Sequence, residues 1–381
     1  MWSKFTGLAA AVFLLTAFAL PASAAPVDTP ARQAWMVDLS TDTVLLDRNG
    51  GEAMHPSSMT KIMTMYVVLE KIRAGELSLN DTLPVSKKAW AMQGSKTWVP
   101  VGEKVRVEDL VRGVIVQSGN DATLVLAEGI AGSEEAFVDM MNRKAVDMGL
   151  TQTHFTNTTG WPDPQHYSSA HDLAVMAARL MKDFPEHYHY YSEREFTFNG
   201  IKQGNRNPLL YRNMGADGIK TGHTEAGGFG MVASVVRNDR RLLLVINGLS
   251  DMQVRADETA RLVEWGFSTF MPVRLAQKGR TYATVPVVYG TQDTVTLTAG
   301  RDLAQSLDAS GRKGISIKAV YSSPLKAPLK AGDNAGKLVV TIPGQDASRE
   351  VPLVVAADVP ETGFWDRLKE NIGMVFSRTD P

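Results

Sequence analysis

The sequence predicts an α/β domain in which helices flank an antiparallel sheet, then a small all-β domain, and finally a C-terminal amphipathic helix. Three observations lead to this fold class. Strand patterns stand near both ends of the stretch up to residue 272, with helical patterns between them, so one sheet must gather distant segments. From residue 273 only short alternating strand patterns follow. The chain then ends in a one-sided apolar helical pattern.

The elements of the first domain follow from periodicity and turn residues. Apolar residues at helical spacing predict helices, whereas short alternating runs bounded by polar turns predict strands. In chain order we expect two strands within 33–48, a helix beginning at Ser58, helical stretches over 107–149 on either side of a turn at 118–120, a helix over Leu173–Met181, a hairpin over 228–249 and a helix over roughly Arg255–Phe270.

The whole chain divides into four segments. Residues 1–24 form a predicted signal peptide, 25–272 the α/β domain, and 273–359 the β-rich domain. A linker and an amphipathic helix occupy 360–381. Within the β-rich domain, strands are expected in 282–300, 314–323 and 337–345, separated by Gly, Pro and Asp.

Composition excludes several classes of function. The 40 basic and 41 acidic side chains give a net charge of -1, which offers no electrostatic basis for binding nucleic acid. The chain has no cysteine, so disulfides, thiolate nucleophiles and cysteine-ligated metals are excluded. No histidine or carboxylate pattern indicates a metal site, and no motif calls for a cofactor.

Both ends of the chain indicate an exported protein at a membrane. One positive charge precedes the apolar run TGLAAAVFLLTAFAL, and Ala22-Ser23-Ala24 supplies the small-residue pattern of a cleavage site. An uncleaved anchor is the alternative. At the other end a helical wheel gathers apolar residues on one face, as in helices that lie in a membrane interface; docking on the protein itself is the alternative. That face consists of Phe364, Trp365, Leu368, Ile372, Val375 and Phe376.

The first candidate for chemistry is the pair Ser58 and Lys61 in HPSSMTKIMT. The S-x-x-K spacing places a hydroxyl and an amine on one helix face, where a neutral lysine can take the serine proton. The pattern is common, however, and it recurs at Ser310/Lys313 and Ser323/Lys326 within the β-rich domain. Ser58 and Lys61 are the pair that opens an apolar helix.

Two further motifs lie downstream. Ser118-Gly119-Asn120 stands on a turn between helical stretches, where the serine and asparagine side chains can both point into one cleft. Lys220-Thr221-Gly222 leads into a predicted strand. A lysine and a threonine hydroxyl there can bind a carboxylate, and Gly222 lets a substrate backbone approach closely.

The order of the three motifs narrows the interpretation. S-x-x-K, S-x-N and K-T-G follow one another at separations of about 60 and then 100 residues, each in a suitable setting. In this the chain resembles the serine penicillin-recognising enzymes. The segments HPSSMTKIMT, VIVQSGNDA, HYSSAHDLA, GNRNPLL, DGIKTGHTEAGG and RADETARLVEWGF resemble those of low-molecular-mass penicillin-binding proteins, the serine D-alanyl-D-alanine carboxypeptidases. The resemblance implies the β-lactamase/transpeptidase-like fold for the α/β domain.

The resemblance also implies roles for individual residues. Ser58 would be the nucleophile and Lys61 its base, with the charge of Lys220 lowering the pKa of Lys61. Ser118 would relay the proton, and Asn120 would position both the substrate and Lys61. Thr221 would bind the substrate carboxylate, with Arg255 at longer range, and Arg206 would lie at the border of the cleft. The backbone N–H groups of Ser58 and His223 would form the oxyanion hole.

The implied activity is removal of the terminal D-alanine from peptidoglycan stem peptides through an acyl-enzyme, with covalent inhibition by β-lactams. The same resemblance leaves a DD-endopeptidase or a β-lactamase of this fold as alternatives, and a non-catalytic envelope scaffold as an alternative of another class. We find no E-x-x-x-N element between Ser118 and Lys220, which disfavours the best-known class of β-lactamase. The expected location is the periplasmic face of the cytoplasmic membrane, as a peripheral protein.

Overall fold

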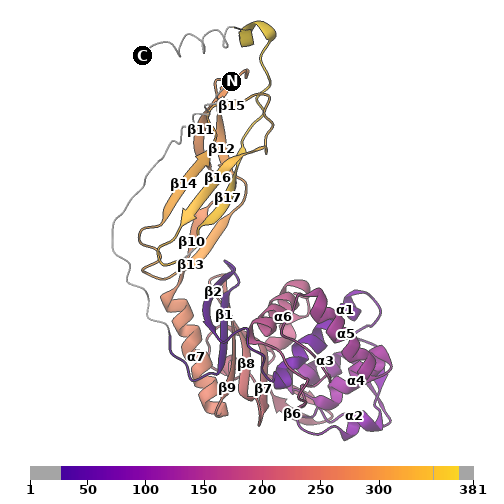
Figure 1. Cartoon of the computed structure of the whole chain (residues 1–381). Coiled ribbons are helices and arrows are strands. Elements are labelled where there is room, and N and C mark those ends of the chain that lie inside the picture. Colours follow the sequence, from indigo (N-terminus) through magenta and orange to yellow (C-terminus); the bar gives the residue numbers. More distant parts are fainter. Residues whose placement is uncertain (1–26, 346, 369–381) are drawn as a thin grey trace. The chain divides into compact units, whose positions relative to one another are not determined.

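A computed structural model describes residues 27–345 and 347–368 (Figure 1). The chain forms two compact units, one comprising Val27–Ser268 and the other beginning at Thr269. The predicted signal peptide and the tail from residue 369 lie outside the described residues.

The first unit is built on a five-stranded antiparallel sheet in the order β2-β1-β9-β8-β7. Strand β1 pairs with β9, which lies some 200 residues later in the sequence, and β2 extends the sheet by pairing with β1. The prediction of a sheet assembled from distant segments is therefore confirmed. The strands are β1 (Gln33–Asp38), β2 (Thr43–Arg48), β7 (Ala216–Thr224), β8 (Gly228–Arg237) and β9 (Arg240–Leu249).

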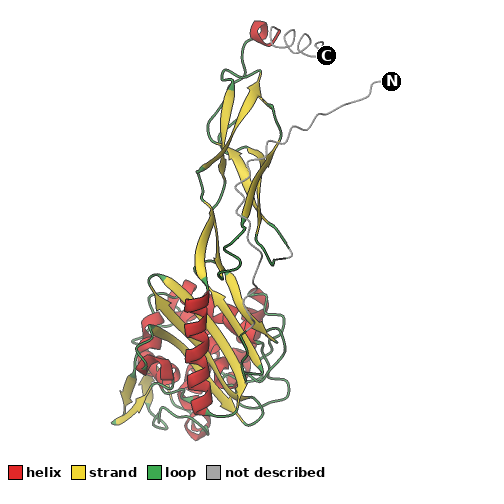
Figure 2. Cartoon of the chain, turned by 90° about the vertical axis from the view of Figure 1, so that its left-hand side faces the viewer, coloured by secondary structure: helices red, strands yellow, loops and turns green. Residues whose placement is uncertain are grey.

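Helices cover both faces of this sheet (Figures 1 and 2). Helix α7 (Met252–Thr269) lies on one face, and the other helices gather on the opposite face. They are η1 (Ser57–Thr60), α1 (Lys61–Arg73), α2 (Lys87–Ala91), α3 (Val107–Val116), α4 (Asn120–Ala131), α5 (Glu134–Asp147), α6 (Ala170–Asp183), η2 (Tyr188–Ser192) and η3 (Pro208–Tyr211). Two small hairpins complete the unit, β3 (Thr82–Pro84) with β4 (Lys104–Arg106) and β5 (Glu195–Phe198) with β6 (Ile201–Gly204).

Alternation along the strands decides which layer each side chain joins. Leu243 and Val245 of β9 belong to the core shared with the helical cluster. Leu242, on the opposite face of the same strand, approaches Gly266 of α7, as does Met36 of β1. Because successive strand residues point to opposite faces, strands with near-continuous apolar sequence can serve both layers at once.

Helix α1 is the centre of the helical cluster. All residues from Lys61 to Leu69 are buried, so the helix has no solvent face over this stretch. A helix that is apolar all round is stable only when it is enclosed by others. The enclosure accounts for the burial of Lys61, the cation in this stretch, which is 1% exposed.

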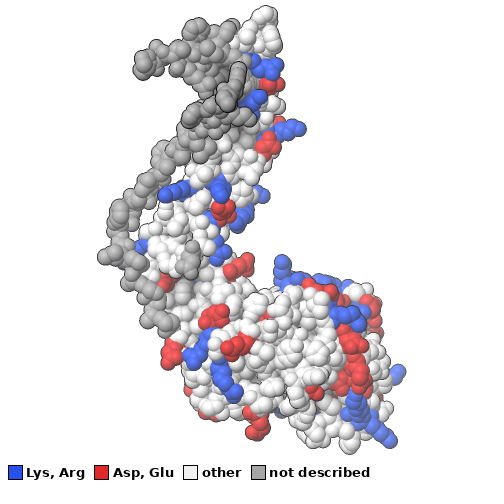
Figure 3. Space-filling model, viewed as in Figure 1, with Lys and Arg blue, Asp and Glu red and all other residues white. Residues whose placement is uncertain are grey.

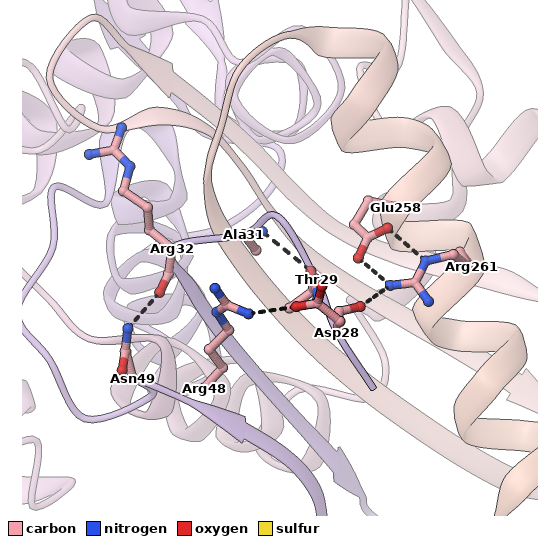
Figure 4. A network of polar contacts seen from close by, with 8 residues as sticks. All are labelled: Asp28, Thr29, Ala31, Arg32, Arg48, Asn49, Glu258 and Arg261. Atoms are coloured by element: carbon pink, nitrogen blue, oxygen red, sulfur yellow. Dashed lines mark hydrogen bonds and ion pairs between the residues drawn. The ribbon is translucent and has the colours of Figure 1, made fainter. Parts of the chain in front are cut away.

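The N-terminal segment of the unit is fastened by a polar network (Figure 4). Arg48 on β2 pairs with the Asp28 carboxylate at 3.2 Å, and Arg261 of α7 donates to the Asp28 carbonyl at 2.5 Å. Arg261 is itself held by Glu258 one turn earlier, at 2.7 Å. The network joins the segment before β1 to the edge of the sheet and to α7.

Element boundaries differ from the sequence-based expectations for local reasons. The helix expected from Leu173 begins at Ala170, because the Ser169 hydroxyl caps it by accepting from Asp172 N. The stretch 107–149 has a second break at Gly132 and Ser133, where glycine takes a φ of 80° and the serine caps α5. The last helix begins at Met252 rather than near Arg255.

The second unit is all-β. Its six-stranded sheet has the order β14-β16-β17-β12-β11-β15, and β10 pairs with β13 separately. The strands are β10 (Met271–Ala276), β11 (Thr281–Val288), β12 (Thr294–Ala299), β13 (Leu303–Leu307), β14 (Ser316–Tyr321), β15 (Leu325–Lys326), β16 (Asn334–Thr341) and β17 (Arg349–Val355). The expected all-β unit is confirmed, although the patterns of β10, β13, β15 and β17 were missed.

The surface supports the argument from composition. On the face shown in Figure 3, basic and acidic side chains are interspersed. Within the described residues no helix is long and apolar enough to span a bilayer. The first turn of the predicted amphipathic helix is described, and Phe364 and Trp365 are both exposed in it.

Candidate active site

Ser58 and Lys61 lie at the junction of η1 and α1, beneath the edge of the sheet. The half-buried Ser58 hydroxyl is 3.1 Å from Lys61 Nζ. Lys61 Nζ also donates to Asn120 Oδ1 at 2.7 Å and to the Thr159 carbonyl at 2.8 Å. The last two atoms can only accept. A neutral amine would give them its two N–H groups and turn its lone pair to the Ser58 hydroxyl.

The Ser118-Gly119-Asn120 turn lies between α3 and α4, as the sequence predicts. Ser118 has a φ of 59°, and Asn120 is the first residue of α4. Asn120 contacts Lys61 through its oxygen and donates from Nδ2 to the Gln93 carbonyl at 2.7 Å. The tight turn therefore directs Ser118 and Asn120 to two different lysines of one site.

Lys220, Thr221 and Gly222 lie within β7 itself, whereas the sequence placed them ahead of a strand. Lys220 is buried and donates to Ser118 Oγ at 2.9 Å. Gly222 faces η1: a Cβ built on it would lie 3.0 Å from the Ser57 Cβ and 3.0 Å from the Pro56 carbonyl oxygen. A side chain at position 222 would push the strand away from the nucleophile's turn.

Burial lowers the pKa of both lysines. The pKa of Lys61 falls from 10.5 to about 7, first because burial disfavours the ammonium, and second because of the positive charge of Arg206; Asp121 acts in the opposite direction. Burial also holds the pKa of Lys220 well below its ordinary value, and repulsion from Lys61 adds to the effect. Burial is thus the main cause for Lys61, and Arg206 is the cation that adds to it, where the resemblance implied Lys220.

Two arginines supply positive charge near the cleft. Arg255 on α7 is 5% exposed, and its Nε has no hydrogen-bond partner within the described part of the chain. Burial and the charge of Arg206 lower its pKa to about 10. The Arg255 guanidinium lies 5.9 Å from the centroid of the Phe229 ring, against which the His223 ring stacks at 3.9 Å. A buried cation of this kind favours an incoming anion.

Arg206 is mostly exposed, and its Nε donates to the Gln117 carbonyl at 3.3 Å. This contact places it beside the Ser118 turn. Burial of part of its guanidinium lowers its own pKa. Arg206 is therefore a charge at the entrance to the site, in keeping with the border position suggested by the sequence.

Several contributors to the site escaped sequence reasoning. The Thr159 carbonyl is invisible in a sequence, because any residue can supply a backbone oxygen. Asp121 is fully buried and accepts from the backbone N–H groups of Thr97, Trp98 and Val99. The buried His166 shares a hydrogen bond of 2.8 Å between its Nε2 and the hydroxyl of Thr60, next to Lys61. Its pKa is lowered to about 4 by burial, so it is neutral at pH 7.

Comparison with known proteins decides the family. The family model described as D-alanyl-D-alanine carboxypeptidase matches residues 20–250, more than half of the chain. The chain belongs to the D-alanyl-D-alanine carboxypeptidase family. A second model, described as the C-terminal domain of penicillin-binding protein 5, matches residues 270–361.

Relatives from this carboxypeptidase family cover nearly the whole chain. D-alanyl-D-alanine carboxypeptidase DacC of Escherichia coli strain K12 is 38% identical over 98% of this chain and 96% of its own length. D-alanyl-D-alanine carboxypeptidase DacA of Haemophilus influenzae is 36% identical over 98% and 97%. These matches confirm the resemblance seen in the sequence motifs and make the chain a hydrolase of the penicillin-binding protein class.

Solved structures of the family agree with the fold. Penicillin-binding protein 5 from Haemophilus influenzae superimposes with a TM-score of 0.78 at 36% identity, covering 89% of this chain and 100% of that one. Penicillin-binding protein D2 from Listeria monocytogenes, in its ampicillin-bound form, superimposes with a TM-score of 0.59 at 25% identity. The match covers 64% of this chain and 100% of that one. The β-lactamase/transpeptidase-like fold with a following all-β unit is thereby confirmed.

Proposed function

We propose that this carboxypeptidase releases the terminal D-alanine of peptidoglycan stem peptides through an acyl-enzyme on Ser58. The D-alanyl-D-alanine carboxypeptidase activity follows from the family, and its relatives carry that name over almost their full length. The observation that carries the choice of nucleophile is the arrangement of Lys61 Nζ. This amine is buried, has a pKa of about 7, and lies 3.1 Å from Ser58 Oγ.

The first half of the reaction forms the acyl-enzyme. Neutral Lys61 takes the proton of the Ser58 hydroxyl, and Oγ attacks the carbonyl carbon of the penultimate D-alanine. The carbon–nitrogen bond to the last D-alanine then breaks. Its nitrogen receives a proton through Ser118, which Lys220 holds at 2.9 Å.

The second half returns the free enzyme. A water molecule attacks the ester carbonyl, Lys61 again serves as base, and Ser58 leaves with a proton. In both halves negative charge develops on the carbonyl oxygen, where we expect the backbone N–H groups of Ser58 and His223 to stabilise it. Thr221 and the buried cation Arg255 would hold the carboxylate of the last D-alanine.

β-Lactams are expected to acylate the same serine. The ampicillin-bound state of the Listeria monocytogenes relative supports this expectation. A β-lactam places its strained amide where the substrate's peptide bond would lie, and the acyl-enzyme that forms retains the rest of the molecule. Ser58 should therefore be labelled once per chain by a fluorescent penicillin.

The direct test is release of D-alanine from a synthetic pentapeptide ending in D-Ala-D-Ala. The mature protein should release it, and Ser58→Ala should not. Ser57→Ala is the matched control. Ser57 is adjacent in sequence, but its hydroxyl contacts the Thr224 hydroxyl at 3.1 Å rather than a lysine. Equal release by the Ser58→Ala form would refute the mechanism. Absence of release by any form, with cleavage of crosslinked dimers instead, would favour the endopeptidase alternative.

We further propose that the protein works at the periplasmic face of the cytoplasmic membrane. The N-terminal signal pattern supports export, and the apolar face of the C-terminal segment supports peripheral binding to the bilayer. The exposure of Phe364 and Trp365 is in keeping with such a face. Pelleting with liposomes tests the idea: the full mature chain should sediment, and a form that ends at Glu361 should stay in solution.

A further inference from the structure

Three tryptophans expose about half of their surface in the first unit. Trp90 is 49% exposed, Trp98 51% and Trp161 49%. Tryptophan is highly buried on average, and exposed aromatic surface that gathers in one place marks a binding site more often than not. These three residues come from two separate segments of the chain, so their proximity is a product of the fold.

Lys96 lies near both the Trp90 and the Trp98 ring, and Trp161 lies beside Gly94 of the same segment. Lys96 Nζ lies 5.6 Å from the centroid of the Trp90 ring and 5.3 Å from that of the Trp98 ring. A Cβ built on Gly94 would meet a ring atom of Trp161 at 3.3 Å. We call Trp90, Trp98 and Trp161, together with Lys96, the tryptophan rim.

The tryptophan rim is attached directly to the catalytic side chains. The backbone of its first segment bonds to Asn120 twice: Asn120 N donates to the Ser95 carbonyl at 2.8 Å, and Asn120 Nδ2 donates to the Gln93 carbonyl at 2.7 Å. On the other side, Trp161 follows Thr159, whose carbonyl accepts from Lys61. The rim therefore borders the site from both of these loops.

The backbone at Trp98 is held in a costly conformation. Its φ is 70°, a left-handed value that bulky side chains rarely adopt. Asp121 enforces this conformation by accepting from the Trp98 N–H at 2.8 Å and from the Thr97 N–H at 2.8 Å. The structure thus fixes an exposed ring in place, rather than leaving it to fold back onto the apolar core.

We propose that the tryptophan rim binds the sugar ring that carries the stem peptide, so that the preferred substrate is a glycan-linked peptide. The proposal rests on the function proposed above. Stem peptides are attached to a sugar, and the C–H face of a pyranose stacks on aromatic rings, while Lys96 offers donors to its oxygens. About four extended residues separate the sugar from the bond that is cut, a reach of about 14 Å. That reach suits a rim whose rings stand two or three residues from the carbonyls that accept from Lys61 and Asn120.

The test compares two soluble substrates, a free pentapeptide and the same pentapeptide linked to its disaccharide. The ratio of the two kcat/KM values is the readout. Wild-type protein should favour the disaccharide form, and Trp98→Ala and Trp161→Ala should each lower the ratio about two- to twelvefold, the range expected for loss of one aromatic stacking contact. Trp98→Tyr keeps a ring and should retain most of the ratio. Trp365→Ala, an exposed tryptophan of the other unit, should leave the ratio unchanged.

A binding measurement keeps the proposal separate from the catalytic one. The product-like disaccharide tetrapeptide is titrated into the Ser58→Ala protein and its Trp98→Ala derivative by calorimetry. Weaker binding in the derivative supports the rim even if no form released D-alanine, an outcome that would count against the proposed function alone. Equal binding, or an equal fall in kcat/KM for both substrates, would overturn the proposal.

Discussion

The pKa of Lys61 leads to a quantitative prediction about pH. The base acts only when its amine is neutral, so the rate of acylation should rise with pH through the pKa of about 7. With an ordinary pKa of 10.5 only about one amine in 3,000 would be neutral at pH 7, whereas at a pKa of about 7 half are neutral. The lowered pKa, due to burial and to the charge of Arg206, therefore raises the active fraction about 1,500-fold.

The same pKa sets the acid limb. At pH 5 about one amine in a hundred remains neutral, so acylation should be about fifty-fold slower than at pH 7. A fluorescent penicillin under single-turnover conditions measures this step without product release. Circular dichroism at each pH establishes that the protein stays folded over the range.

A charge substitution checks the cause. The charge of Arg206 is the second cause, after burial, of the low pKa of Lys61. Arg206→Gln should therefore raise this pKa and move the acid limb to higher pH. Arg212→Gln is the matched control, since Arg212 pairs with Asp257 at 2.6 Å and does not act on Lys61. A profile that is flat between pH 5 and 7, or one that rises only near pH 10, would refute the assignment of Lys61 as the neutral base.

Three further predictions concern individual contacts. Gly160→Ala should abolish acylation, because its Cβ would lie 1.8 Å from the Ser57 carbonyl oxygen; Gly149→Ala has a similar φ but open space and should cost only about 1 kcal/mol of stability. Asp121→Ala should lower the free energy of unfolding by about 3 kcal/mol or more in urea titrations, since several buried N–H groups lose their acceptor. Arg255→Met should raise KM about tenfold, and the effect should vanish for substrates that end in D-alaninamide.

The elements of the fold with strong local patterns could be predicted. The helix after Ser58 and the hairpin over β8 and β9 carry long apolar runs with clear punctuation, and both occur. Among the missed strands of the second unit, Met271–Ala276 has only two buried residues, at its end, whereas Arg349–Val355 alternates but contains Pro352. Their pairing with distant strands compensates for what their own sequence lacks.

The residues of the candidate site could be predicted from the sequence, but their electrostatic properties could not. Ser58, Lys61, Ser118, Asn120 and Lys220 could be named because their motifs recur in a known order. The structure places Lys61 within hydrogen-bond distance of Ser58 and Asn120, and Lys220 within hydrogen-bond distance of Ser118. Their electrostatics could not be worked out from the sequence. The position of Lys220 within β7, rather than before it, was also decided by pairing with β8.

The sequence by itself determined the residue types, the order of the motifs and, through them, the family. Only the tertiary structure decided that the amine of Lys61 is buried, which carbonyl supplies its third contact, and that Trp161 lies against the segment that bonds to Asn120. The physical reason is that burial and charge interactions depend on distance in space. A pKa is changed by neighbours some 60 to 150 residues away, and no local pattern records how closely they approach.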